Sequence, residues 1–194
     1  MSGKDTKAEI LTIARDLLAS GGLAAVSFEA VARRLGRTKQ AVLYWYPTKH
    51  DLLAAMFLPW LEAEAELAVQ SVSGTSSREE AIDAFVKAVA AFHLGDLDRF
   101  RMMYLLVQTI PPSPAEPHSE ELLKKIHPVT DRLYGALADK LGAKPIPARQ
   151  EAFAIHSAIL GLVLMFGLSD SLKDPLKHTA THMIDALIRT FTSR

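Results

Sequence analysis

Cysteine is absent from this chain of 194 residues. Disulfide scaffolds, zinc fingers, iron–sulfur clusters and cysteine nucleophiles are therefore excluded. Long apolar runs are absent too: the longest stretch without a polar side chain covers residues 158–168, whereas a membrane-spanning helix needs about 20 residues. No apolar segment follows the charges at the N-terminus, as it would in a secretory signal. Together these absences predict a cytoplasmic protein.

Patterns typical of β-strands and of common enzymes are also missing. We find no run of alternating β-branched residues and no Asn-Gly or Asp-Gly hairpin turn. There is no phosphate-binding loop, nucleophile elbow, zinc-protease motif or glycine-rich dinucleotide fingerprint. Asp96 and Asp98 are the nearest approach to an acidic magnesium cluster and are too few. We therefore expect no catalytic activity and no cofactor.

The composition is that of a globular protein, with 49% hydrophobic and 23% charged residues. The net charge is zero but unevenly distributed. Residues 1–50 hold eight Lys or Arg against four Asp or Glu, and the remainder holds 14 against 18. A basic N-terminal segment suggests an anionic partner for that segment, although a difference of this size also arises by chance.

Helix signals run through the whole chain, so we predict an all-α fold of about nine helices, the first three short. Thr6 and Glu9 form a capping-box pattern at the first start, and Gly21-Gly22 marks the first end. Ser27 and Thr38 are the expected caps of the next two helices. The expected spans are 6–22, 27–35, 38–45, 48–72, 76–94, 97–109, 119–141, 148–168 and 175–192.

Prolines set further boundaries. Four prolines within residues 111–117 predict an exposed linker. Pro128 should kink or split the helix expected over 119–141. Residues 142–147 are expected to form a loop, and Asp174-Pro175 is expected to begin the last helix.

Only Gly36-Arg37 separates the second expected helix from the third, a spacing typical of a helix-turn-helix. The second helix of such a pair normally enters the major groove of DNA with its N-terminal residues against the base edges. Short helix pairs of this kind also occur in proteins that do not bind DNA, and aromatic residues in them are usually core.

Hydrogen-bonding side chains begin the third expected helix. Lys39 can reach guanine, Gln40 can pair with adenine, and Thr38 can contact phosphate or a thymine methyl group. One of the aromatic residues that follow can stack on the sugar-phosphate backbone, and Lys49 begins the next helix, where a phosphate can bind. The candidate DNA-binding residues are Ser27, Arg37, Thr38, Lys39, Gln40, Tyr44, Trp45 and Lys49.

Residues 28–53, FEAVARRLGRTKQAVLYWYPTKHDLL, resemble the N-terminal signature of TetR-family transcriptional regulators. The shared pattern is a helix ending in Ala-x-x-x-Gly, a turn, a Thr-Lys start, an aromatic pair and Pro-Thr-Lys-x-x-Leu. In an ungapped alignment the family's usual Tyr falls at Leu43. Which of Leu43, Tyr44 and Trp45 faces the phosphate backbone is therefore left open.

The resemblance implies an all-helical homodimer with a DNA-binding domain in residues 1–49 and a larger helical domain in residues 50–194. Each subunit would bind half of a palindromic operator through its helix-turn-helix. The larger domain would dimerise and bind a small effector, whose binding releases the DNA. Repression is the family's commoner behaviour; the operator, the effector and the regulated genes do not follow from the sequence.

The helix expected over 148–168 is apolar on nearly every side and so has to be buried on nearly every side. A second subunit would bury its second face, and small residues such as Ala154, Ala158 and Gly161 allow close approach. Helix 175–192 adds an apolar stripe. We expect both helices to form the homodimer interface; the alternative is the central helix of a monomer.

Methionines, aromatics and a few polar residues of the C-terminal helices are typical of a small-molecule pocket, and equally of plain core. The candidate effector-binding residues are Phe92, Met102, Met103, Leu106, Gln108, His127, Tyr134, Phe153, His156 and Met165. They predict an apolar or amphipathic effector. His178 and His182 have metal-ligand spacing, but with no third ligand nearby in sequence we interpret them as surface residues.

The alternative is a helix-turn-helix DNA-binding protein without an effector pocket. Such a protein either binds many DNA sequences or is controlled by a partner protein. A ligand that changes the affinity for DNA distinguishes the two.

Overall fold

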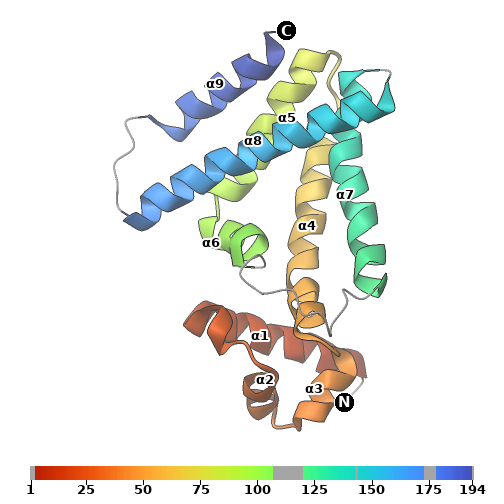
Figure 1. Cartoon of the computed structure of the whole chain (residues 1–194), viewed down its shortest axis with the longest axis vertical. Helices are drawn as coiled ribbons and strands as arrows, with labels where there is room; N and C mark the ends of the chain where they lie inside the picture. Colours follow the sequence, from red (N-terminus) through yellow and green to blue (C-terminus); the bar gives the residue numbers. More distant parts are fainter. Residues whose placement is uncertain (1–2, 107–119, 143, 173–177, 194) are drawn as a thin grey trace. The chain divides into compact units, whose positions relative to one another are not determined.

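The computed structural model describes residues 3–106, 120–142, 144–172 and 178–193. All regular elements in these residues are helices (Figure 1), as the sequence predicts. The described residues divide into two compact units: the first contains 3–59, 106 and 120–126, and the second contains 60–105 and 127–193. Helix α4 (Lys49–Ser73) contributes residues to both units and contains Pro59 at the point where they divide.

The first unit begins with α1 (Gly3–Ala25), α2 (Phe28–Leu35) and α3 (Lys39–Trp45). Helix α1 starts before Thr6, so the predicted capping box there is wrong. Its predicted end is visible as a break, because Gly22 has φ 65° and ψ −169°, a conformation essentially restricted to glycine. The core of this unit includes the aliphatic residues Ile10, Ala14, Leu18 and Val42, together with Tyr46.

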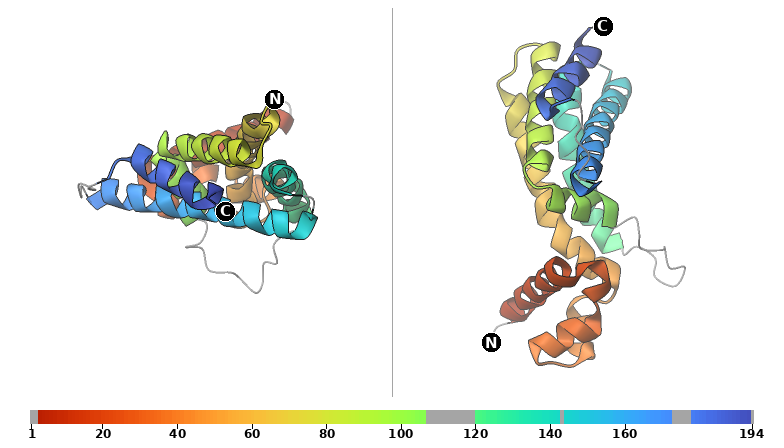
Figure 2. Two further views of the ribbon diagram at one scale, coloured as in Figure 1. Left: turned by 90° about the horizontal axis from the view of Figure 1, so that it is seen from above. Right: turned by 90° about the vertical axis from the view of Figure 1, so that its left-hand side faces the viewer.

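The second unit contains α5 (Arg78–Leu94), α6 (Leu97–Phe100), the π-helix η1 (Arg101–Leu106), most of α7 (Glu120–Leu141), α8 (Pro145–Leu172) and α9 (Ala180–Thr192). Helices α5, α8 and α9 pack against one another (Figures 1 and 2). Arg78 links all three: its guanidinium lies 2.5 Å from the Glu151 carboxylate on α8 and donates to the carbonyl of Phe191 on α9 at 3.1 Å.

Several predicted boundaries in this unit are wrong. The helix expected to start at Ser76 is instead capped by Ser77, whose hydroxyl accepts from the Glu80 N–H at 3.1 Å, while the Glu80 carboxylate accepts from the Ser76 N–H at 2.8 Å. Pro128 does not split α7: it is exposed and lies inside a continuous helix. The expected linker at 111–117 lies outside the described residues.

The ends of α8 and α9 also differ from expectation. Helix α8 begins at Pro145, since the first turn of a helix needs no intrahelical N–H donor. The cap of α9 is Thr179, whose hydroxyl accepts from the His182 N–H at 3.2 Å, and not Asp174, which lies outside the described residues.

Helix α8 combines a buried face with an exposed apolar face. By length and composition Pro145–Ser169 could cross a membrane, and 33% of its most apolar window is buried. Its buried face, which includes Ala152, Ile155, Ile159 and Val163, belongs to the core of the second unit. Its other face exposes large apolar side chains in the single chain, namely Phe153, Leu164, Met165 and Leu168.

Candidate DNA interface and a buried polar cluster

Local hydrogen bonds shape the helix-turn-helix of the first unit. The Ser27 hydroxyl accepts from the Ala30 N–H at 3.1 Å and begins α2. Gly36 ends α2 in the left-handed region at φ 67°, where glycine carries no steric penalty. The Thr38 hydroxyl then accepts from the Ala41 N–H at 3.3 Å and begins α3. The predicted caps Ser27 and Thr38 and the predicted stop at Gly36 are confirmed.

The start of α3 offers polar side chains to solvent. Arg37, Thr38, Lys39 and Gln40 are all exposed. Gln40 and Tyr44 are four residues apart and therefore share one face of the helix. Tyr44 is the most exposed large apolar side chain among the described residues, at 77%. These groups can reach a nucleic acid without any rearrangement of the packing.

The aromatic residues of α3 separate into core and surface. Tyr46 is buried; its hydroxyl donates to the Lys7 carbonyl at 3.5 Å, and burial raises its pKa to about 12. Tyr44 points outward, and its ring meets that of Trp45 edge-on at 5.1 Å between centroids. Leu43 and Trp45 are half-buried. Tyr44 is therefore the aromatic side chain most available to a phosphate backbone.

Lys39 is paired within the chain. Its ammonium lies 2.7 Å from the Glu29 carboxylate on α2. The hydrogen bond from Lys39 lowers the pKa of Glu29, so the pair is ionised at neutral pH. Both side chains are about half exposed, so the pair is weak and can exchange its partner for a phosphate or a base.

Lys49 lies in the first turn of α4, directly after Thr48, which forms a capping box with Asp51. The Thr48 hydroxyl accepts from the Asp51 N–H at 3.0 Å and donates to the Asp51 carboxylate at 2.8 Å. The same carboxylate accepts from the Thr48 N–H at 3.2 Å. This box fixes the start of α4, and with it the half-buried Lys49.

Three of the candidate effector-binding residues lie close together in the second unit. His156 is buried and Tyr134 half-buried, with the Tyr134 hydroxyl 3.5 Å from His156 Nδ1. The Phe153 ring lies 5.5 Å from that of Tyr134 but is 56% exposed. Of the remaining candidates, Phe92, Met102 and Met103 are half-buried, His127 and Met165 are exposed, Leu106 ends η1, and Gln108 lies outside the described residues.

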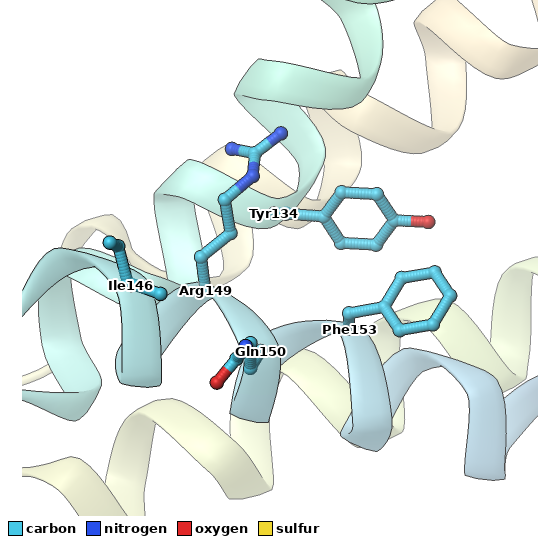
Figure 3. Close-up of a pocket in the computed structure, with 5 residues that line it drawn as sticks. All are labelled: Tyr134, Ile146, Arg149, Gln150 and Phe153. Carbon is cyan, nitrogen blue, oxygen red and sulfur yellow. The ribbon is translucent and has the colours of Figure 1, made fainter.

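A surface pocket of about 440 Å³ opens beside Tyr134 (Figure 3). Its lining residues are Tyr134, Ile146, Arg149, Gln150 and Phe153. Figure 3 shows the Tyr134 and Phe153 rings close together on one side and the Arg149 side chain extending past Tyr134. Arg149 also pairs with the exposed Asp131. The pocket therefore joins two aromatic rings to a guanidinium at the surface.

Deeper in the unit, Glu64 of α4 lies completely buried among two histidines and a tyrosine. One carboxylate oxygen, Oε1, accepts from His93 Nε2 on α5 at 3.0 Å and from His156 Nε2 on α8 at 2.7 Å. The other, Oε2, accepts from the Tyr104 hydroxyl at 2.7 Å. His93 Nδ1 is buried and has no hydrogen-bond partner among the described residues. Glu64 is not among the residues predicted from the sequence.

These contacts determine the ionisation of the cluster. Burial by itself would raise the pKa of Glu64. The hydrogen bonds from His156 and His93 lower it by more, so that the resulting pKa is about 2. Burial, followed by the charge of Glu64, raises the pKa of Tyr104 far above its usual range and also raises that of Tyr134. At neutral pH the cluster is therefore a buried carboxylate surrounded by hydrogen-bond donors.

The comparisons with known proteins agree with this architecture. Residues 10–56 match the family model of bacterial regulatory proteins, tetR family. No curated protein sequence matches the chain.

Three solved structures illustrate the similarity over the whole chain. A transcriptional regulator from Streptomyces coelicolor A3(2) is 21% identical, with a TM-score of 0.64 over 97% of this chain and 99% of that chain. FadR from Bacillus subtilis, solved in complex with stearoyl-CoA, is 16% identical, with a TM-score of 0.65 over 96% and 97%. A tetR-family regulator from Shewanella sp. PV-4 is 18% identical, with a TM-score of 0.63 over 97% and 96%.

At these identities the structures establish a shared fold, and the family model identifies the helix-turn-helix. Residues 10–56 form a helix-turn-helix of the type found in bacterial regulatory proteins of the tetR family. The whole chain shares the fold of solved tetR-family regulators, and the tetR family model matches its N-terminal helix-turn-helix.

Proposed function

We propose that the protein is a ligand-responsive repressor that acts in the cytoplasm and binds a palindromic operator as a homodimer. The observation that carries this proposal is the exposed, hydrogen-bonding start of α3 within a tetR-type helix-turn-helix. In this arrangement α3 enters the major groove, with Lys39 and Gln40 against base edges. Arg37, Thr38 and Tyr44 contact the sugar-phosphate backbone, and Ser27, Trp45 and Lys49 flank these contacts.

Different substitutions test the roles of two lysines. Because Lys39 reads a base, K39A should lose about 1–3 kcal/mol of discrimination at one operator position. Because Lys49 contacts phosphate, K49A should weaken binding to all DNA sequences alike. The slope of the logarithm of the binding constant against the logarithm of the salt concentration should become smaller by about one. K87A, at an exposed lysine of α5, is the matched control and should leave both unchanged. Equal effects of K39A and K49A on every sequence would reject these roles.

The exposed face of α8 supports the homodimer. Leu164, Met165 and Leu168 are between 40% and 55% exposed in the single chain. Ala154 and Gly161, which are small and exposed on the same helix, allow a second helix to approach closely. We assign this face, together with α9, to a two-fold interface between subunits.

Sedimentation of two variants tests the interface. L164E places a charge in the proposed interface and should convert dimer to monomer, since burying an unpaired carboxylate is costly. A91E introduces the same residue at an exposed position of α5 and should remain dimeric. A dimeric L164E protein would reject the interface.

For the effector we propose a small apolar or amphipathic molecule bound in the second unit. Support comes from the similar fold of FadR, which was solved with stearoyl-CoA, an amphipathic ligand. Long-chain acyl-CoA is therefore the first probe. Effector binding would shift α4, the helix that contributes to both units, and so change the spacing of the two recognition helices. That spacing has to match one turn of DNA, about 34–36 Å.

The experiment that tests the proposal is selection of duplexes from a random DNA pool, followed by anisotropy measurements on the selected sequence. Enrichment of one palindrome, and its release by acyl-CoA or another small molecule, is the expected result. Enrichment without release by any ligand would favour a helix-turn-helix protein that lacks an effector pocket. Salt-sensitive binding that is equally strong for all sequences would reject the proposal of a specific operator.

A further inference from the structure

Three helices of the second unit deliver metal-binding side chains to one buried point. Glu64 comes from α4, His93 from α5 and His156 from α8, and each is no more than 2% exposed. One donor atom from each residue lies within 4.8 Å of the other two. Two imidazoles and one carboxylate are the ligand set that proteins use for zinc and for non-haem iron.

The distances suit an ion of zinc size. Zinc binds histidine nitrogen and carboxylate oxygen at about 2.0–2.2 Å, which places tetrahedral ligand atoms about 3.3 Å apart. The two Nε2 atoms now lie 3.0 Å and 2.7 Å from Glu64 Oε1. Moving the carboxylate oxygen outward by a few tenths of an ångström, and bringing the two histidine nitrogens, which lie within 4.8 Å of each other, to the same separation, would admit the ion.

The cluster is enclosed as well as close together. Glu64 is fully buried, and its ion-pair partners among the described residues are the two histidines. A buried carboxylate needs a partner, and a divalent ion bound by the same three side chains would be one.

The neighbouring tyrosines match the outer shell of a metal site. Ligands of a bound metal are normally oriented by further hydrogen bonds. The Tyr104 hydroxyl donates to Glu64 Oε2 at 2.7 Å, so Oε1 remains available for the ion. The Tyr134 hydroxyl lies 3.5 Å from His156 Nδ1, which leaves Nε2 directed at the same point. By contrast, His178 and His182 are exposed and gain no third donor among the described residues.

We propose that Glu64, His93 and His156 form a binding site for one divalent transition-metal ion of the zinc type in each chain. Three protein ligands leave at least one coordination position for water or an exogenous ligand. Because the ligands come from α4, α5 and α8, a bound ion would tie together three helices of the second unit.

Cobalt is the first probe, since Co²⁺ occupies zinc sites and absorbs visible light. The untagged full-length protein is stripped with a chelator and titrated with Co²⁺, then with Zn²⁺. We expect one equivalent of Co²⁺ per chain, with visible bands of four- or five-coordinate cobalt that Zn²⁺ abolishes. Absence of these bands, or binding well below one equivalent, would overturn the proposal.

Variants locate the ion. E64Q and H93N should lose the bands, whereas H182N, at an exposed histidine, should keep them. Y104F keeps all three ligands but loses the outer hydrogen bond, so it should show the same bands with an affinity about 10–100-fold weaker. Loss of the bands in H182N, or their persistence in E64Q and H93N, would place the ion elsewhere and refute the site.

H156C gives a positive signature, even if the other ligand variants fold poorly. A cysteine thiolate is itself a good ligand for zinc and cobalt. Because the chain contains no cysteine, a sulfur-to-cobalt charge-transfer band in H156C can arise only from position 156. Cobalt bands without this charge-transfer band would overturn the role of His156. All these measurements use the protein without DNA, so they do not depend on the operator or the effector.

Discussion

Tyr104 makes a short hydrogen bond to the buried carboxylate, so its hydroxyl should contribute measurably to stability. Its O–H donates to Glu64 Oε2 at 2.7 Å, and Glu64 is ionised and fully buried. A hydrogen bond to a charged group contributes about 1.5–3 kcal/mol. Y104F keeps the ring and opens no cavity, so we expect the free energy of unfolding of the metal-free protein to fall by about that amount.

Tyr134 provides the matched comparison. Its hydroxyl lies 3.5 Å from His156 Nδ1, at the limit of a hydrogen bond, and the ring is half-buried at a surface pocket. Y134F removes the same atom from the same residue type. The hydroxyl that it removes makes only a weak contact and can be reached by water. Y134F should therefore lower the free energy of unfolding by less than about 0.5 kcal/mol.

Urea unfolding of the metal-free protein, followed by circular dichroism and by tyrosine and tryptophan fluorescence, measures both values. For a chain of this size, the Y104F loss corresponds to a fall in the thermal midpoint of about 2–4 °C per kcal/mol. A loss below about 0.5 kcal/mol for Y104F, or an equal loss for Y134F, would refute the argument that charge and distance decide the contribution.

Three further predictions concern other parts of the molecule. E29Q frees Lys39 and removes a negative charge near the DNA, so operator affinity measured by anisotropy should rise about two- to five-fold; unchanged or weaker binding would contradict this. Thermal unfolding should show that G22A costs more than G36A, because an alanine tolerates the left-handed region of Gly36 better than the φ and ψ of Gly22; the reverse order would be inconsistent with the observed backbone. R78Q loses its ion pair to α8 and should lower the free energy of unfolding by about 1–2 kcal/mol; urea titration giving wild-type stability would show that the link is dispensable.

The helix-turn-helix could be predicted from the sequence because its signals are local. Ser27 and Thr38 each cap a helix through a hydrogen bond to a residue three positions later. Gly36 ends α2 within the same short window. The Ser77 cap of α5 shows the limit of this approach, since Ser76 and Ser77 each stand three residues before a glutamate, and only the folded chain distinguishes them.

Glu64 could not be found in the same way, because its burial depends on helices far away in the sequence. It alternates with Glu62 and Glu66, a pattern that suggests a solvated surface. A weak signal was present: Glu64 follows the buried Phe57 by seven residues and precedes the buried Ala68 by four, so it falls on the buried face of α4. His156 was easier, since it interrupts an apolar helix and needs a polar partner.

Stability and sequence preference reside in different side chains of the helix-turn-helix. Val42 and Tyr46 are buried and hold α3 in place, while the backbone caps define its start. Lys39, Gln40 and Tyr44 point outward and contribute little to packing. These three residues can therefore be exchanged, by natural selection or by design, to create a different operator preference without destabilising the domain. The DNA sequence that this small unit recognises is thus easily changed.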